Sequence, residues 1–202
     1  MHRPPPADAR TNLVGPMSIA MRAARLVRYL GGALVVLVLI AAFWSSQSPP
    51  TPWIETQSSD PAPRFTLETL DGDTFRMAEH ENEVVVVNFW ATWCPPCRKE
   101  IPEFMKLQQS MGDDGVQVVG ISLDQGGPDP VRRFATNMDI NYPIGIDDGH
   151  IASAFGGVQS LPTTYIIGPD GQIRGHIPGL ATAEMLRPGL QTLLDEAGED
   201  DV

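Results

Sequence analysis

Two cysteines, Cys94 and Cys97, are the residues of this chain whose type and spacing point most directly to chemistry. They are the only cysteines in 202 residues, and two residues separate them. They follow an apolar, β-branched run (84–89) and lead into a segment with helical periodicity (97–111). The unpaired N–H groups and the dipole at the start of a helix stabilise a thiolate. The spacing therefore predicts a pair that exchanges thiol and disulfide.

The two cysteines are expected to divide that work. Cys94, exposed at the helix start, would attack a substrate disulfide, and Cys97, one turn in and more buried, would resolve the mixed disulfide. Pro95 and Pro96 stiffen the loop between them and remove two N–H donors. They should tune the stability of the thiolate, in a direction that the sequence does not specify.

Other uses of two cysteines fit less well. A structural zinc site needs four ligands. The remaining candidates are scattered: His2, His80, His150 and His176. Covalent haem attachment needs a histidine after the second cysteine, where this chain has Arg98. A purely structural disulfide that closes so short a loop would stabilise the fold little.

A longer pattern surrounds the pair. The motif NFWATWCPPC, followed 65 residues after Cys97 by Pro162 in LPTTYIIGPDG, resembles the thioredoxin superfamily. The most similar branch is the TlpA/ResA-like group of membrane-anchored, extracytoplasmic thiol–disulfide oxidoreductases, which includes cytochrome c maturation proteins. The resemblance covers residues 60–197. It implies an α/β, thioredoxin-like fold, with a central mixed sheet flanked by helices, an N-terminal hairpin and an extra α/β insertion.

The resemblance also assigns site residues. Cys94 and Cys97 would be catalytic, and Pro162, preceded by Leu161, is similar to the family's cis-proline, which faces the cysteines and presents backbone groups to substrate. The residues expected to contact substrate are Trp93, Pro95, Pro96, Leu161 and Pro162. Two alternatives stay open: simple core packing for Trp93 and an ordinary loop proline for Pro162.

Glu100 is the third catalytic candidate. It is the one polar residue on a helical face that it shares with Cys97, Phe104, Leu107 and Met111. Asn88 occupies the position where many cytoplasmic thioredoxins keep a buried acid, and the resemblance implies a functional Glu at position 100 instead. Burial would raise the pKa of Glu100 and let it exchange protons with the thiols. The alternative is a solvated residue at the helix edge.

Further elements follow from periodicity and turn residues. A hairpin is expected around Asp71-Gly72. Separately, Phe155, Gly156 and Gly157 lie shortly before Pro162 and are candidates for lining the substrate groove. The predicted strands are 116–123, 142–146, 163–167 and 172–177. The predicted helices are 130–138, 150–155 and 181–196, the last interrupted at Pro188-Gly189. Residues 130–146 would form the insertion. Strands that alternate with helices predict a mixed α/β sheet.

The amino-terminal part is predicted to lie outside this fold. Three arginines, Arg22, Arg25 and Arg28, precede an uncharged stretch (29–44) of about 24 Å as a helix, a little short of a bilayer core of about 30 Å. A single transmembrane signal-anchor is favoured over a cleaved signal peptide, because bulky residues occupy the place where cleavage needs small ones. The predicted segments are a cytoplasmic 1–28, the anchor 29–44, a Ser/Pro-rich linker 45–59, the domain 60–197 and an acidic tail 198–202. With the arginines inside, the domain lies on the periplasmic or extracellular side of a bacterial cytoplasmic membrane.

Charge narrows the range of partners. The chain carries −11, with +4 over residues 1–44 and −15 over the rest. So acidic a domain argues against nucleic acid as a partner. The expected activity is reduction of disulfides in secreted client proteins, with no cofactor or metal besides the redox-active disulfide. By resemblance, the clients would be apocytochrome c or copper-site proteins, and a transmembrane thiol carrier would donate the electrons. An oxidase or isomerase using the same residues and a copper-binding assembly factor are the alternatives.

Overall fold

The computed structural model describes residues 35–40 and 60–200. The chain divides into two compact units, Met1–Pro49 and Pro50–Val202. In the first unit, residues 35–40 form a helix whose apolar side chains are exposed. None of the helices in the described residues is both long and apolar enough to cross a membrane.

The segment predictions for the amino-terminal part are therefore largely outside the described residues. Of the predicted anchor 29–44, only 35–40 is described. The predicted cytoplasmic segment 1–28 and linker 45–59 lie wholly outside.

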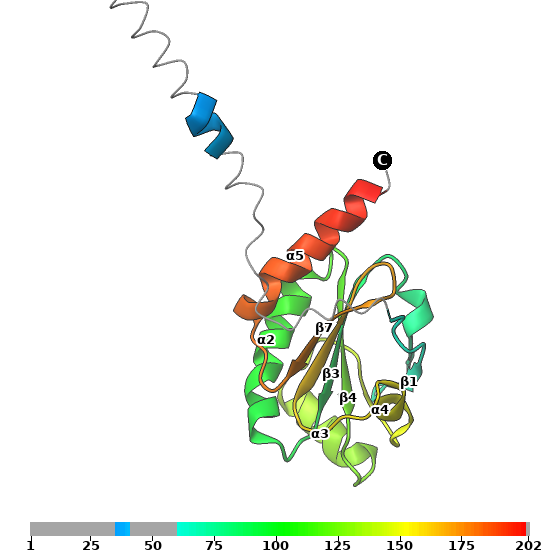
Figure 1. Ribbon diagram of the computed structural model, residues 1–202. Helices are drawn as coiled ribbons and strands as arrows, with labels where there is room; N and C mark the ends of the chain where they lie inside the picture. The colour runs from blue at the N-terminus through cyan, green and yellow to red at the C-terminus, as the bar shows by residue number, and fades with distance from the viewer. Residues whose placement is uncertain (1–34, 41–59, 201–202) are drawn as a thin grey trace, which may run out of the picture. The chain divides into compact units, whose positions relative to one another are not determined.

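The second unit is built on a five-stranded sheet with the order β5-β4-β3-β6-β7 (Figure 1). The strands are β3 (Val84–Trp90), β4 (Val116–Ser122), β5 (Ile144–Ile146), β6 (Thr163–Ile167) and β7 (Ile173–Pro178). The β3–β4 and β4–β5 pairs are parallel, whereas β3–β6 and β6–β7 are antiparallel. This mixed sheet confirms the predicted fold class.

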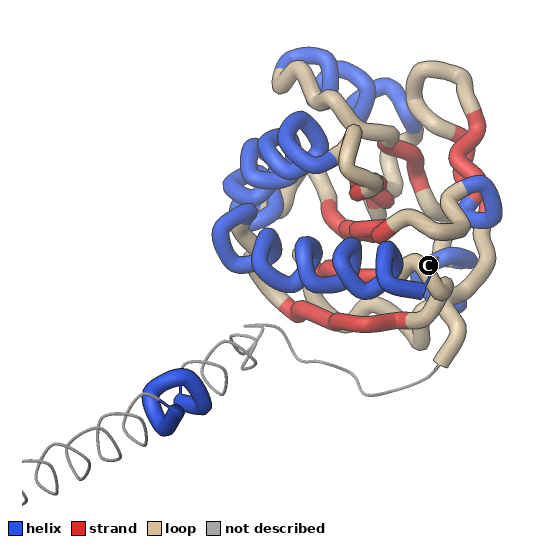
Figure 2. Tube along the Cα trace, turned by 90° about the horizontal axis from the view of Figure 1, so that it is seen from above, coloured by secondary structure: helices blue, strands red, loops and turns tan. Residues whose placement is uncertain are grey.

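Helices and a small hairpin flank the sheet, so that its strands lie between them (Figure 2). The helices are α2 (Pro95–Met111), α3 (Pro128–Asn137), α4 (His150–Ala154) and α5 (Ala183–Asp200). The hairpin strands β1 (Thr66–Glu68) and β2 (Thr74–Arg76) pair antiparallel, as predicted, in a sheet of their own, and the 3-10 helix η1 (Met77–Glu79) follows.

Successive residues of β3 supply two different cores, because side chains alternate across a strand. Val84, Val86 and Trp90 pack with α2, α3 and α5 on one face. Val87 and Phe89 pack with the hairpin and α4 on the other. All seven residues of β3 are buried, which explains why the strand reads as a continuous apolar run.

The C-terminal helix corrects two predictions. α5 runs through Pro188 without a break, and it continues to Asp200, so residues 198–200 of the predicted acidic tail are helical. Pro188 lies in the second turn, where the N–H that it lacks would have bonded to Glu184. Both residues are exposed, so water can take over the freed carbonyl, while Leu186 and Leu190 keep the opposite face buried.

Truncating Leu190 should destabilise the domain strongly. Leu190 is 0% exposed within the core shared by α5 and the sheet, so we expect Leu190→Ala to lower the free energy of unfolding by about 2–5 kcal/mol. Exposed Glu196 provides the control, since Glu196→Ala should change it by less than about 0.5 kcal/mol. Urea unfolding under non-reducing conditions measures both. Equal effects would contradict this packing.

Candidate redox site

The cysteine pair lies where β3 leads into α2. Cys94 is the N-cap of α2, with extended backbone angles, and it forms a disulfide with Cys97 across a Cα–Cα distance of 5.3 Å. The Cys94 Sγ accepts a hydrogen bond from the Cys97 N–H at 3.2 Å. Pro95 and Pro96 fill the first two helical positions, where an N–H would have no partner within the helix. A backbone donor is thus aimed at the sulfur that would carry the thiolate.

The two cysteines differ less in their exposure to solvent than predicted. Cys97 is 0% exposed, but Cys94 is only 3% exposed in this disulfide form, so the expectation of an exposed Cys94 is wrong here. The helix cap brings the Cys94 sulfur back over the first turn, toward the Cys97 N–H. Cys94 is nevertheless the cysteine that lines a surface groove. A client sulfur can therefore approach Cys94 through this groove.

The groove has a volume of about 420 Å³. Its lining residues are Trp93, Cys94, Pro95, Pro96, Leu123, Val158, Gln159, Ser160 and Leu161. Four of the five predicted substrate contacts are among them. Trp93 is 67% exposed, so core packing does not explain this tryptophan. All of the lining residues are uncharged, which suits a largely apolar client segment around its cysteine.

Pro162 adjoins the groove without lining it. The Leu161–Pro162 peptide is cis, as the resemblance implied, and Pro162 is buried. The Pro162 carbonyl accepts a hydrogen bond from the Gly179 N–H at 2.8 Å. That carbonyl is thus occupied within the domain.

The predicted groove contribution of Phe155, Gly156 and Gly157 is wrong. Phe155 packs in the core, with its ring centroid 5.4 Å from that of Phe89 and 4.7 Å from that of Tyr165. A large ring gains more from this aromatic cluster than from an open groove. The segment that follows, 158–161, forms the groove wall instead.

Glu100 is fully buried, at 0% exposure, one helical turn after Cys97. Its Oε1 accepts a hydrogen bond from Asn88 Nδ2 at 2.8 Å, and its Oε2 accepts one from the Ala181 N–H at 3.1 Å. The alternative of a solvated residue at the helix edge is therefore wrong. Both hydrogen-bond partners are uncharged, so the carboxylate lacks a compensating cation among the described residues.

This environment shifts the titration of Glu100. Burial raises the pKa of the Glu100 carboxyl to about 7, although the hydrogen bonds from Ala181 and Asn88 act in the opposite direction. Tyr142 is buried close by, and burial together with the charge of Glu100 raises its pKa. A carboxyl group that titrates near neutral pH can both take and give a proton under working conditions.

Asp124 belongs to this site and was missed in the sequence. Its Oδ1 accepts a hydrogen bond from Thr92 Oγ1 at 2.6 Å, and its Oδ2 accepts from the Thr92 N–H and from Ser122 Oγ, both at 2.8 Å. The carboxylate thereby holds the chain two residues before Cys94 against the end of β4. The available signal was its position directly after a strand parallel to β3, since the carboxyl ends of parallel strands meet at one edge.

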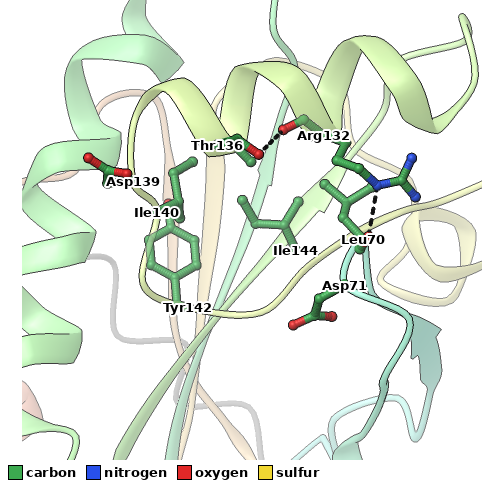
Figure 3. A pocket seen from close by; sticks show the side chains of 9 residues that line it. Leu70, Asp71, Arg132, Thr136, Asp139, Ile140, Tyr142 and Ile144 are labelled. Atoms are coloured by element: carbon green, nitrogen blue, oxygen red, sulfur yellow. Dashed lines mark hydrogen bonds between the residues drawn. The ribbon is translucent and has the colours of Figure 1, made fainter.

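A second cavity, of about 390 Å³, lies between the hairpin turn, α3 and β5 (Figure 3). Its lining includes Leu70, Arg132, Thr136, Tyr142 and Ile144 and shares no residue with the groove at Cys94. Arg132 is engaged by the Leu70 carbonyl and Asp129, and Thr136 Oγ1 donates to the Arg132 carbonyl. We assign this cavity no chemistry. No group of three metal-binding side chains occurs among the described residues.

The stability of the domain should depend on pH through Glu100. The pKa of this group is raised in the folded state, so its contribution is fully present below pH 4.5 and is lost as the pH rises through about 7. Glu100→Gln carries no charge and should escape this loss. The unfolding free energy of the unmodified protein, relative to Glu100→Gln, should fall by about 3 kcal/mol across that window.

Glu103, one turn further along α2, is the matched control. Its carboxylate accepts hydrogen bonds from Lys106 Nζ and from the Ala183 N–H, and these lower its pKa. Any contribution of Glu103 should therefore be lost as the pH falls, the opposite sign. Urea unfolding from pH 4 to 9 compares the unmodified protein, Glu100→Gln and Glu103→Gln. A difference between Glu100→Gln and the unmodified protein that stays flat with pH would argue against a buried, titrating carboxyl group.

Comparison with known proteins places this site in a family. The AhpC/TSA family model matches residues 59–176. The thioredoxin-like protein YneN of Bacillus subtilis (strain 168) is 34% identical over 163 residues, which cover 79% of this chain and 95% of that protein. The thiol-disulfide oxidoreductase ResA of Halalkalibacterium halodurans is 32% identical over 143 residues, covering 70% of this chain and 80% of its own.

Solved structures agree with these relatives. A thiol:disulfide interchange protein of the thioredoxin family from Chlorobium tepidum TLS superposes with a TM-score of 0.64 at 31% identity, covering 68% of this chain and 97% of its own. StoA from Bacillus subtilis gives 0.57 at 25% identity, covering 66% and 99%. This chain therefore belongs to the AhpC/TSA family and is a thiol–disulfide oxidoreductase of the ResA and thioredoxin type, with Cys94 and Cys97 as its redox pair.

Proposed function

We propose that this protein reduces disulfides in secreted client proteins, on the outer side of a bacterial cytoplasmic membrane. The observation that carries the proposal is the asymmetry of the pair. Cys94 lines an uncharged groove, whereas Cys97 is completely buried behind it. That arrangement lets a client reach only one sulfur, which is what stepwise exchange through a mixed disulfide requires.

The reaction starts from the reduced pair. The Cys94 thiolate attacks one sulfur of the client disulfide, and the other client sulfur leaves as a thiolate and takes up a proton. Cys97 then loses its proton and attacks the Cys94 sulfur, which forms the Cys94–Cys97 bond and releases the second client thiolate. Two electrons pass to the client, and each client sulfur takes up one proton. One of these protons became available when Cys94 ionised, and the other is released by Cys97. Glu100, one turn from Cys97, is the proposed acceptor for the Cys97 proton.

The charges near the pair favour the reducing direction. Glu100 lies one turn beyond Cys97, and Asp124 holds the loop before Cys94. Negative charge near a cysteine disfavours its thiolate. The first cation in the sequence of α2, Arg98, lies with its guanidinium 5.3 Å from the centre of the Phe134 ring. A dithiol whose thiolate is less stabilised gives up its electrons more readily.

The client class and the location rest on the relatives and on the amino-terminal sequence. Proteins named ResA are among the relatives, and the earlier resemblance suggests apocytochrome c or copper-site proteins as clients. Three arginines before the apolar stretch 29–44 favour a domain outside the membrane. A transmembrane thiol carrier would then return two electrons to the Cys94–Cys97 disulfide.

The reduction potential of the pair tests the direction. We expect equilibration of the purified protein with dithiothreitol or glutathione to give about −270 mV or lower, the range of thioredoxin. A value near −120 mV, the range of a strong oxidant, would contradict a reductant and favour the oxidase or isomerase alternative. The same reduced sample tests the copper alternative. Tight uptake of one Cu(I) per protein would support an assembly factor, and we expect none.

The location can be tested with reporters fused after Val202. Alkaline phosphatase folds only outside the cytoplasm, because its disulfides need an oxidising compartment. We expect the phosphatase fusion to be active. Changing Arg22, Arg25 and Arg28 together to Glu should lower that activity several-fold, because orientation follows the positive charges. The second reporter is a fluorescent protein that folds in the cytoplasm. An inactive phosphatase fusion together with a fluorescent fusion to this second reporter would contradict the proposed location.

A further inference from the structure

Asn88 is a buried residue that the exchange reaction leaves without a role. It is 0% exposed at the centre of β3, between Gly120 of β4 and Thr164 of β6. Its Nδ2 donates to Glu100 Oε1 at 2.8 Å and to Thr164 Oγ1 at 3.1 Å. Its Oδ1 is buried and lacks a hydrogen-bond partner among the described residues. An unpaired buried carbonyl is costly, so it calls for an explanation.

The two ends of a side-chain amide have nearly the same shape and opposite hydrogen-bonding character. An ionised Glu100 can only accept, which suits the Nδ2 now facing it. A protonated Glu100 has an O–H to donate and needs an acceptor. If the Asn88 amide turned by half a rotation, Oδ1 would take the place of Nδ2. It would then lie within reach of Glu100 and of the Thr164 hydroxyl, which can donate as well as accept.

We propose that Asn88 is a positioning residue for Glu100, whose amide turns with the protonation state of that carboxyl group. Nδ2 donates to the ionised form, and the Oδ1 that is now unpaired accepts from the protonated form. The inference rests on the proposed role of Glu100 in so far as a proton must enter and leave that carboxyl. The turn itself requires no client and no particular direction of electron flow.

The other hydrogen-bond partner of Glu100 in the described residues cannot replace Asn88. The Ala181 N–H can only donate. Tyr142 adds burial and is itself affected by the charge of Glu100. On the same helix, Cys97 is held in the disulfide, and Glu103 pairs with Lys106 at the surface. Asn88 is thus the hydrogen-bond partner of Glu100 that can change from donor to acceptor.

Such a partner would let Glu100 change its charge in a dry site with little movement of the backbone. A fixed donor would oppose protonation, and a fixed acceptor would oppose ionisation. An amide at the centre of a rigid sheet can serve both forms by rotation of one side chain. The Cys97 proton could then be received and passed on without opening the core.

The first test compares two substitutions on the full, oxidised chain with ¹³C-labelled Glu carboxyls, followed by NMR from pH 4 to 9. Asn88→Ala removes a charge-assisted hydrogen bond from the ionised form and a weaker, neutral one from the protonated form, so the pKa of Glu100 should rise by somewhat less than about one unit. The control is Thr164→Val, because the Thr164 hydroxyl accepts a hydrogen bond from Asn88. Thr164 is not one of the hydrogen-bond partners of Glu100 described above. This substitution should shift that pKa by less than about 0.3 units. Equal shifts in the two variants would overturn the proposal.

A second readout leaves residue 88 unchanged, so it does not depend on the folding of a variant at that position. The side-chain ¹H–¹⁵N signals of Asn88 should move with pH at the same midpoint as the Glu100 carboxyl. In Glu100→Gln they should stay constant. Asn88 signals that remain constant while Glu100 titrates would overturn the turning amide. A reduction potential in the oxidant range would overturn the proposed function as a reductant. It would not affect the conclusion about the Asn88 amide, because that conclusion does not depend on the direction of electron flow.

Discussion

Complete burial of the central strand is the constraint on which the rest of this domain depends. β3 has no exposed residue, so each of its faces needs a covering layer and each of its edges a paired strand. The parallel pairing with β4 and the antiparallel pairing with β6 satisfy the edges. The helices on one side and the hairpin with α4 on the other satisfy the faces. A strand held on all sides gives its carboxyl end a well-defined position.

The redox pair uses that fixed end. The chain leaves β3 and turns into α2 over a few residues, so that Cys94 caps the helix and Cys97 lies fully buried within the first turn. Asp124 ties the turn to the neighbouring strand through Thr92. The backbone path from β3 into α2 therefore leaves one sulfur open to the groove and the other protected.

The buried carboxyl group of Glu100, unlike the layers around β3, lowers the stability of the fold. It does so at the place where the chemistry is expected. A charge without a partner cation is disfavoured in the core, and near neutral pH the fold loses part of its stability when Glu100 ionises. Two neutral donors, from Asn88 and Ala181, limit this cost. The buried layers on both faces of β3 provide stability that can offset this cost.

The sequence by itself determined the order of helices and strands, the redox pair and the neighbourhood of the groove. These features depend on local patterns: the valine run of β3, the spacing of Cys94 and Cys97, and the proline before β6. Element ends shifted by a few residues, as for α2, which begins at Pro95 rather than Cys97. The predicted break at Pro188 failed because the buried face of α5 outweighs the one hydrogen bond that this proline removes on the exposed side.

Only the tertiary structure decided the depth of the side chains and their long-range partners. Whether Glu100 was solvated or buried depended on Ala181, 81 residues away, and on the covering helices. Segments far apart in the chain likewise decide three other features: the burial of Cys94, the core position of Phe155 and the hydrogen bonds from Thr92 to Asp124. Helical and strand periodicity show which face a residue occupies, but not what covers that face, and it is the cover that sets solvation, pKa and access.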